Sequence, residues 1–131
     1  MSWRYLDLAD YLVIAEAATG TPAETLMRAA QLHLAESALS AAAASFGGIE
    51  FYPEFEVKAA VLCARIVKNH ALPDGNKRTG YLCLREFVER NGRSWRKSDN
   101  DPDETATIIE GVAGGEVSEE ELAEWIRART G

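Results

Sequence analysis

The sequence predicts an all-α fold of about six helices, with one short extended segment ahead of a central pair of helices. Apolar residues recur every three or four positions over most of the chain, as on the buried face of a helix. Capping residues, prolines and glycines divide the chain into segments of helical length. We expect a single domain over residues 1–131, because this length is typical of one domain.

The first two helices are expected on either side of Gly20. Helical spacing of apolar residues covers residues 3–18, and Gly20 ends that stretch. Thr21 is expected to cap the next helix, with Pro22 at its first position. This Ala-rich helix is expected to reach about residue 44, in one or two pieces.

An extended segment and a strongly apolar helix follow. Paired glycines and then aromatic and β-branched residues make residues 45–53 an extended or hairpin-like segment. A helix with a continuous apolar stripe is expected over about residues 54–69. It should end before Pro73, because proline disfavours helical geometry in the residue that precedes it.

Three further helices complete the chain. One covers about residues 76–90 and is closed by Asn91-Gly92. The next has Asp101 as its cap and runs to about residue 113, where paired glycines end it. Ser118 and Glu121 form a capping box for the last helix.

The composition favours a cytoplasmic, soluble domain without membrane contact. No apolar run approaches the roughly 18 residues that a membrane span needs. The N-terminus lacks the basic-then-apolar order of a signal peptide. Two cysteines cannot form a disulfide framework. Both are expected in the core, where the two later tryptophans should also pack: Cys63, Cys83, Trp95 and Trp125.

Charge is distributed unevenly along the chain. The net charge is −7, yet residues 58–97 contain ten basic and three acidic residues, so this segment is +7 and the remainder is −14. An acidic total argues against direct nucleic-acid binding, which depends on neutralising many phosphates. A positive centre in an acidic protein suits a small anion better. Most of the ten basic side chains are expected only to cover solvated helix faces.

The connection between the two central helices gathers the residues with the most chemistry. A helix N-terminus presents unpaired backbone N–H groups and a partial positive charge, and therefore binds anions. Lys77 and Arg78 stand in the first turn, where the helix dipole favours acids instead. Basic residues in place of acids are expected here if a polyanion binds between the two cations.

The other polar residues of this loop have roles that fit a phosphorylated ligand. His70 can accept a proton from an attacking hydroxyl. Asp74 is the one acid of the loop and a ligand for Mg²⁺, which takes carboxylate and phosphate oxygens. Gly75 allows close approach of the backbone, and Asn76 can orient the loop or bind a phosphate. The alternative is an ordinary turn followed by a helix cap. His33 has no such neighbours and is expected to be structural.

The loop resembles a known signature. It is similar to the Fic/Doc superfamily pattern, and closest to the H-x-F-x-D-[AG]-N-K-R-T of the Doc (death on curing) branch: His70-Ala71-Leu72-Pro73-Asp74-Gly75-Asn76-Lys77-Arg78-Thr79. The likeness extends to residues 35–39, which resemble the L-x-E-S-A-L helix of the family. Residues 51–53 look like its flap, and residues 114–125 resemble its terminal helix.

The resemblance implies a specific reaction. By family analogy the protein is a Doc-type toxin that transfers a phosphate from ATP, with Mg²⁺, to a threonine of elongation factor Tu. His70 is then the general base, Asp74 the Mg²⁺ ligand, and the phosphate-binding turn consists of Gly75, Asn76, Lys77 and Arg78. Relatives that transfer AMP carry Gly and a later Arg where this chain has Lys77 and Tyr81. A Fic-type AMP transfer remains the alternative.

One departure and one absence complete the comparison with the pattern. Leu72 replaces the family Phe, which leaves open a degenerate module that binds a nucleotide or partner without turnover. The inhibitory motif [ST]-x-x-x-E-[GN] does not occur. By analogy, a separate antitoxin with a disordered tail that folds on binding would restrain the protein. The flap is expected to align a segment of the target as an added strand.

Overall fold

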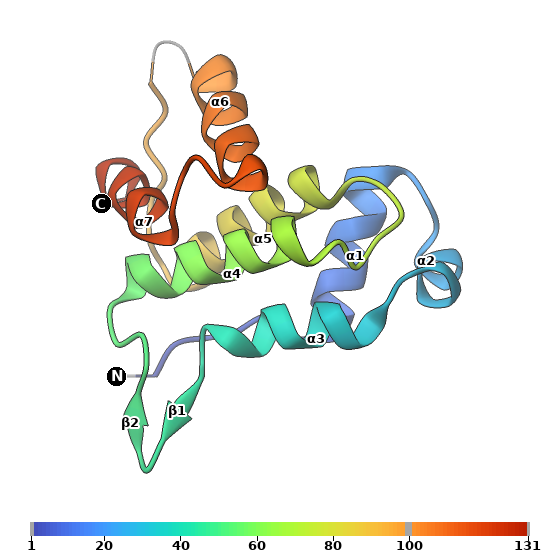
Figure 1. Ribbon diagram of the computed structural model, residues 1–131, viewed down its shortest axis with the longest axis horizontal. Helices are drawn as coiled ribbons and strands as arrows, with labels where there is room; N and C mark the ends of the chain where they lie inside the picture. The colour runs from blue at the N-terminus through green and yellow to red at the C-terminus, as the bar shows by residue number, and fades with distance from the viewer. Residues whose placement is uncertain (1, 99–100, 131) are drawn as a thin grey trace.

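The computed structural model describes residues 2–98 and 101–130, which form seven helices and one two-stranded hairpin (Figure 1). The bounds are α1 Leu8–Thr19, α2 Ala23–Ala29, α3 Leu32–Ala41, β1 Ser45–Phe46, β2 Ile49–Glu50, α4 Phe55–Asn69, α5 Asn76–Arg90, α6 Asp101–Gly114 and α7 Glu119–Arg129. The predicted all-α class with a short extended segment is confirmed. Among the described helices, none is long and apolar enough to cross a membrane.

Helix α4 is the centre of the fold. It contacts α3, α5, α6 and α7, and most of its residues are buried because its neighbours cover it on several sides (Figure 1). Gly80 allows α5 to pack closely against it, since a Cβ there would lie 2.6 Å from Val67 Cγ2 and 3.1 Å from the Cys63 carbonyl oxygen. Cys63 and Cys83 are fully buried, as expected for core residues.

The first helix begins later than predicted. Asp7 caps it at Leu8, because the Asp7 side chain accepts from the Asp10 N–H at 2.8 Å and the Asp10 side chain accepts from the Asp7 N–H at 2.9 Å. The expected start at residue 3 is therefore wrong. The apolar side chains ahead of Asp7 still pack on the core, but from a non-helical segment. The helix ends at Gly20, as expected, with φ of 75°.

The Ala-rich stretch forms two helices, α2 and α3, which is one of the two expected outcomes. Thr21 does not cap α2. The cap position is Pro22, and the first helical N–H, of Ala23, donates to the Glu16 carboxylate at 2.9 Å. At the break between α2 and α3, the Gln31 N–H donates to the Ala71 carbonyl at 2.7 Å, which ties this corner to the α4–α5 connection.

The C-terminal helices pack across α4. Ser118 and Glu121 form the predicted capping box of α7. Trp95 and Trp125 pack edge to face at 5.3 Å, as expected of packing residues. Asp101 is the first residue of α6 rather than a cap that precedes the helix. Helix α5 ends at the predicted Asn91-Gly92 cap, where Gly92 has φ of 74°.

Candidate active site

The connection between α4 and α5 leaves the helix at His70. This residue has φ of 51° and ψ of 46°, and it is the one non-glycine residue with positive φ in residues 2–98 and 101–130. Such a left-handed conformation costs a non-glycine residue about 1–3 kcal/mol and recurs at functional sites. Pro73 was expected to end this helix, but it restricts only the residue before it, Leu72. Helix α4 has already ended three residues earlier, at Asn69. The His70 side chain is exposed.

Buried contacts hold the loop at both ends. The Asn69 side-chain amide donates to the Leu34 carbonyl at 3.2 Å, and Ala71 accepts from Gln31. Leu72 is 3% exposed and belongs to the hydrophobic core. The leucine therefore anchors the loop in the core at the position where the family pattern has phenylalanine.

Asn76 closes the loop from inside. Its Oδ1 accepts from the Leu72 N–H at 3.1 Å, and its Nδ2 donates to the Leu72 carbonyl at 2.9 Å. Because Asn76 is buried, these two bonds satisfy backbone groups that water does not reach. Of the two roles left open by the sequence, the Asn76 side chain has the first: it orients the loop.

Gly75 is required by both conformation and space. Its φ is 85°, and a Cβ at this position would lie 2.6 Å from Thr19 Cγ2. Thr19 is in turn fixed by its hydroxyl, which donates to the Ala15 carbonyl at 2.7 Å and accepts from the Thr21 N–H at 3.1 Å. Sequence reasoning missed Thr19, because nothing in the spacing of residues 19 and 75 indicates that they meet.

The N-terminus of α5 has unpaired backbone donors. The first N–H with a backbone acceptor is that of Thr79, which donates to the Gly75 carbonyl at 3.0 Å. The N–H groups of Asn76, Lys77 and Arg78 have no hydrogen-bond partner among the described residues, and no side chain caps this helix. Together with the helix dipole they form a site for an anion.

Two charged side chains at this helix end are available to a ligand. Asp74 and Arg78 are exposed and make no hydrogen bond or ion pair within the part of the chain that the structure describes. Lys77 Nζ lies 3.2 Å from Glu110 Oε1 on α6, but both side chains are at least half exposed. Such a pair contributes little stability, so the Lys77 ammonium can exchange Glu110 for a ligand.

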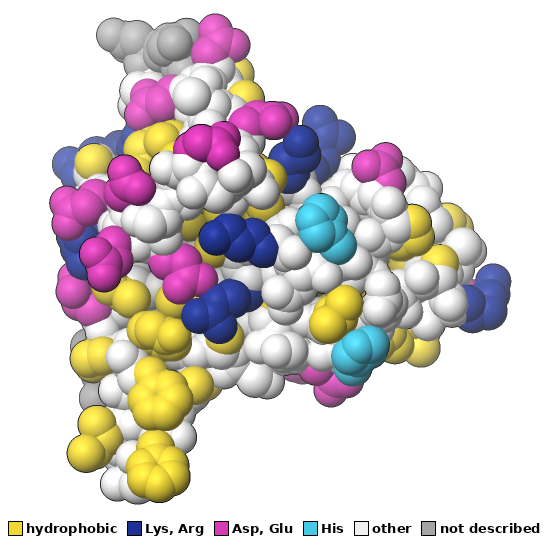
Figure 2. All heavy atoms as spheres, in the orientation of Figure 1, with side chains coloured by type: hydrophobic (Ala, Val, Ile, Leu, Met, Phe, Trp, Pro, Cys, Tyr) yellow, Lys and Arg dark blue, Asp and Glu magenta, His cyan; other side chains and the backbone are white. Residues whose placement is uncertain are grey.

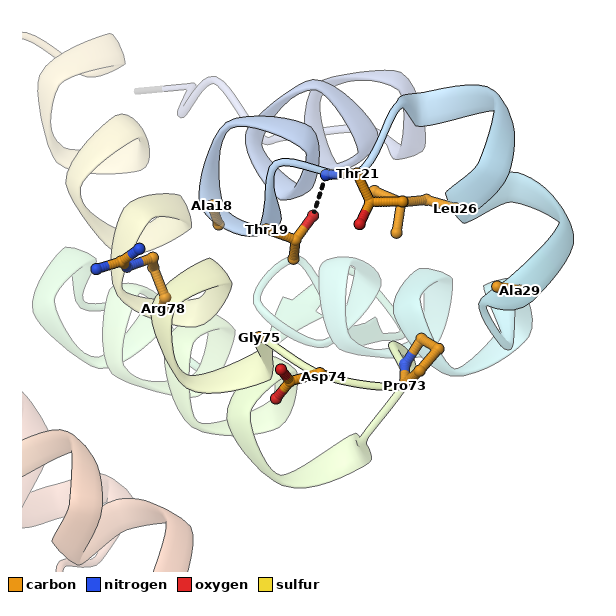
Figure 3. Close-up of a pocket in the computed structure, with 9 residues that line it drawn as sticks. All are labelled: Ala18, Thr19, Thr21, Leu26, Ala29, Pro73, Asp74, Gly75 and Arg78. Atoms are coloured by element: carbon orange, nitrogen blue, oxygen red, sulfur yellow. Dashed lines mark hydrogen bonds between the residues drawn. The ribbon is translucent and has the colours of Figure 1, made fainter.

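Two cavities flank the N-terminal turn of α5, and Arg78 lines both. One cavity, of about 400 Å³, lies between the loop and the α1–α2 turn, where Thr19 and Thr21 face the segment Pro73–Gly75 (Figure 3). The other, of about 540 Å³, lies between α5 and α6 and is lined by Lys77, Tyr81, Thr105 and Glu110 among others. His70 lines neither cavity.

Both histidines are visible on the face shown in Figure 2. His33 is exposed on α3, and its imidazole has no hydrogen bond among the described residues. It therefore lacks the burial or bonding that its expected structural role requires. His70 differs from His33 in that it is the residue at which the chain leaves α4, with the left-handed backbone described above.

The positive segment is more fully paired than expected. Most of its basic side chains were expected to be only solvated, and this is wrong, because seven bond to side chains or carbonyls within the described residues. The seven are Lys58, Arg65, Lys77, Arg85, Arg90, Arg93 and Arg96. Arg78 differs from them in having no such partner, which makes it the cation of the loop that is most available to an anion.

Comparisons with known proteins agree with the resemblance in the loop. Residues 5–88 match the family model of the Fic/DOC family. The curated protein Toxin Doc from Mycolicibacterium smegmatis (strain ATCC 700084 / mc(2)155) is 32% identical to this chain over 109 residues. The aligned region covers 83% of this chain and 80% of that protein. The family match contains the whole α4–α5 connection and ends within α5.

Proposed function

This chain belongs to the Fic/DOC family, and on that premise we propose that it is the toxin of a toxin–antitoxin pair. Its proposed reaction is the transfer of a phosphate from ATP to a serine or threonine hydroxyl of a protein. By resemblance to the Doc branch, the target is a threonine of elongation factor Tu, whose modification blocks translation.

One observation carries the proposal: the N-terminus of α5 combines two cations with three backbone N–H groups that have no partner among the described residues. The N–H groups of Asn76, Lys77 and Arg78 supply hydrogen bonds, and the Lys77 and Arg78 side chains supply charge. Phosphoryl transfer depends mainly on positioning and charge stabilisation. This helix end fits that requirement, because its donors are fixed before any ligand arrives.

His70 is the proposed general base. Its left-handed backbone turns the chain out of α4 and leaves the imidazole exposed beside the start of the loop. A neutral imidazole at this place can take the proton of the attacking hydroxyl while that oxygen bonds to the terminal phosphorus of ATP, and ADP leaves. Helix α4 fixes the backbone before His70, and Leu72 and Asn76 hold the loop that follows it to the core.

Asp74 is the proposed Mg²⁺ ligand. Its carboxylate is exposed and unpaired within the described residues, which is the donor chemistry that Mg²⁺ prefers. When bound, Mg²⁺ would neutralise part of the phosphate charge. The fit is also electrostatic. Asp74 carries one negative charge and the two neighbouring cations carry two positive charges, so the net charge of the three side chains stays positive and attracts a triphosphate.

The cavity between α5 and α6 is the proposed place for the nucleoside part of ATP. It begins at Lys77 and Arg78 and continues along Tyr81 to Thr105. Tyr81 is fixed there, because its hydroxyl accepts from Arg85 Nη1 at 2.8 Å. An aromatic ring suits a base or a sugar, whereas the later arginine of AMP-transferring relatives would add a further phosphate contact.

An antitoxin is the proposed partner that restrains the activity. The name of the M. smegmatis relative motivates this step, as does the absence of the inhibitory motif from this chain.

The second proposed protein contact is with the target, along the β1–β2 hairpin. Ser45 and Glu50 are opposite each other in the ladder, between the Phe46–Ile49 pair and the Phe51 N–H bond to Ala44. In such an alternating ladder their backbone groups point outward and can pair with an added strand.

The direct test uses ATP labelled at either the α or the γ phosphate, incubated with the protein, Mg²⁺ and elongation factor Tu. We expect label on the factor from γ-labelled ATP only. His70→Ala should abolish the transfer, because the other proton acceptor of the loop, the Asp74 carboxylate, is assigned to Mg²⁺. His33→Ala is the matched control, since it removes the other exposed histidine, and it should transfer label at the wild-type rate.

Three outcomes contradict parts of the proposal. Label from the α position would replace phosphate transfer by AMP transfer. Absence of transfer from either position by folded protein, with nucleotide still bound, would favour a binding module without turnover. Equal loss in His70→Ala and His33→Ala would remove His70 from the reaction.

A further inference from the structure

Lys58 is a fully buried lysine near the start of α4. It is 0% exposed, and its Nζ donates to the Ala42 carbonyl at 3.0 Å and to Glu50 Oε1 at 2.7 Å. The Tyr5 ring lies 5.5 Å from the ammonium. A buried ammonium is costly to desolvate and is retained where its partners compensate it. Here the partners come from two different places: the end of α3 and strand β2.

The hairpin has few other links to the protein. Its large apolar side chains point into solvent, with Phe46 78%, Ile49 74% and Phe51 60% exposed. Figure 2 shows these hydrophobic side chains gathered on the part that projects at the lower left, where Figure 1 places the hairpin. The Phe51 N–H bond to Ala44 extends the hairpin ladder itself. Among the described residues, the Lys58–Glu50 pair is therefore the one side-chain bond from β1 or β2 to a helix.

The same helix that carries Lys58 ends beside His70. Asn69 is eleven positions after Lys58, a distance of about 16.5 Å along a helix that rises 1.5 Å per residue. Helix α4 is buried against its neighbours and therefore rigid. Any part of the hairpin that is fixed to Lys58 is thus fixed relative to His70 as well.

We infer that Lys58 is a positioning residue that sets the β1–β2 hairpin relative to His70, so that a target segment paired with the hairpin presents its hydroxyl to the imidazole. This inference rests on the proposed function. The Glu50 bond acts on strand β2, whose outward backbone groups would receive the target, and the Ala42 bond fixes the ammonium to the end of α3. Lys58 touches neither substrate, and it acts through Glu50.

The test compares Lys58→Met with Arg90→Met. Methionine keeps the length of the buried stem and removes the ammonium. Arg90 is the matched control, because it is a partly buried cation at the end of α5 and is paired with Asp10 and Glu86 rather than with the hairpin or the residues that follow it. The double variant Lys58→Met with Glu50→Gln removes the buried pair without leaving a lone charge, and it covers the case in which Lys58→Met fails to fold.

Two measurements are made on each variant. Hydrogen exchange of the amides of residues 45–51 reports hairpin anchoring and needs no activity; we expect it to rise in both Lys58 variants and to stay unchanged in Arg90→Met. Steady-state kinetics should show the KM for the protein target raised about tenfold or more, with the KM for ATP within about twofold of wild type. Ile49→Pro, which removes an N–H from the ladder, should give the same pattern.

The outcomes separate the two proposals. Unchanged exchange at residues 45–51 in the Lys58 variants overturns the anchoring role of Lys58, whatever the activity. Raised exchange with an unchanged KM for the target, or equal loss toward ATP and target, overturns its positioning role. A wild-type protein that transfers no label overturns the proposed function instead, and the exchange result still decides whether Lys58 holds the hairpin.

Discussion

Asn76→Ala is expected to loosen the catalytic loop from inside. The substitution removes both bonds to Leu72, and so leaves one N–H and one carbonyl unpaired at a residue that is 3% exposed. Each buried backbone group without a partner costs about 1–3 kcal/mol, so we expect the free energy of unfolding to fall by about 3 kcal/mol. The free N–H groups at the start of α5 should lose their fixed direction as well.

Asn91, the residue that follows the last turn of α5, provides a matched control. Its side chain bridges a backbone N–H and carbonyl in the same way, accepting from the Arg4 N–H at 2.7 Å and donating to the Arg4 carbonyl at 3.0 Å. The Arg4 groups are exposed and can bond to water when the amide is removed. The Phe87 carbonyl, to which Asn91 Nδ2 also donates at 2.8 Å, still accepts from the Asn91 N–H at 3.3 Å. Asn91→Ala should therefore cost only about 1 kcal/mol.

Urea denaturation measures both costs, and titration calorimetry measures the affinity for ATP with Mg²⁺. We expect Asn76→Ala to lose both stability and nucleotide affinity, and Asn91→Ala to bind the nucleotide as the wild type does. Equal losses of stability in the two variants would refute the reasoning, because burial of the Leu72 groups would then make no difference. If Asn76→Ala is strongly destabilised but binds ATP with wild-type affinity, the anion site does not depend on the two Asn76–Leu72 bonds.

The remaining predictions concern Gly75 and the pH dependence of stability. Gly75→Ala should destabilise the protein by more than Gly92→Ala in urea denaturation, because both residues have positive φ but only at Gly75 would the new Cβ lie 2.6 Å from Thr19 Cγ2. Thr19→Ser, which removes that methyl group and keeps the hydroxyl, should recover the difference; no recovery would exclude the contact as its cause. Hydrogen bonds from Arg129, Ser98 and Trp125 lower the pKa of Glu104 from 4.5 to about 2. Since a lowered folded-state pKa contributes stability that is lost as pH falls from about 4.5 to about 2, Glu104→Gln should flatten that part of a stability profile, and an unchanged slope would contradict the assignment.

The sequence predicted the helical elements best where local chemistry decides them. Gly20, Asn91-Gly92 and the Ser118 capping box end or begin helices as expected, because their conformations depend on neighbours in sequence. The first helix was misjudged for a related reason. Apolar spacing continues through residue 3, but the reciprocal bonds of Asp7 and Asp10 start the helix later.

The loop residues could also be found by sequence, because the chemistry they carry is local. His70, Asp74, Lys77 and Arg78 lie within nine positions, and the inverted charge at the start of α5 is readable without coordinates. The role of each side chain in the loop could not be predicted from the sequence. Burial of Asn76 beside Leu72 assigns its side chain to the loop, and this depends on how α4 and α5 pack.

By itself, the sequence determined the helical class, the position of the loop and the family likeness, because periodicity, caps and a contiguous motif are encoded by neighbouring residues. Only the tertiary structure decided that Thr19 covers Gly75, that Glu110 meets Lys77, and that Lys58 is buried beneath the hairpin. Each of these contacts joins residues from different elements. Their meeting depends on the packing of whole helices around α4, which no short stretch of sequence contains.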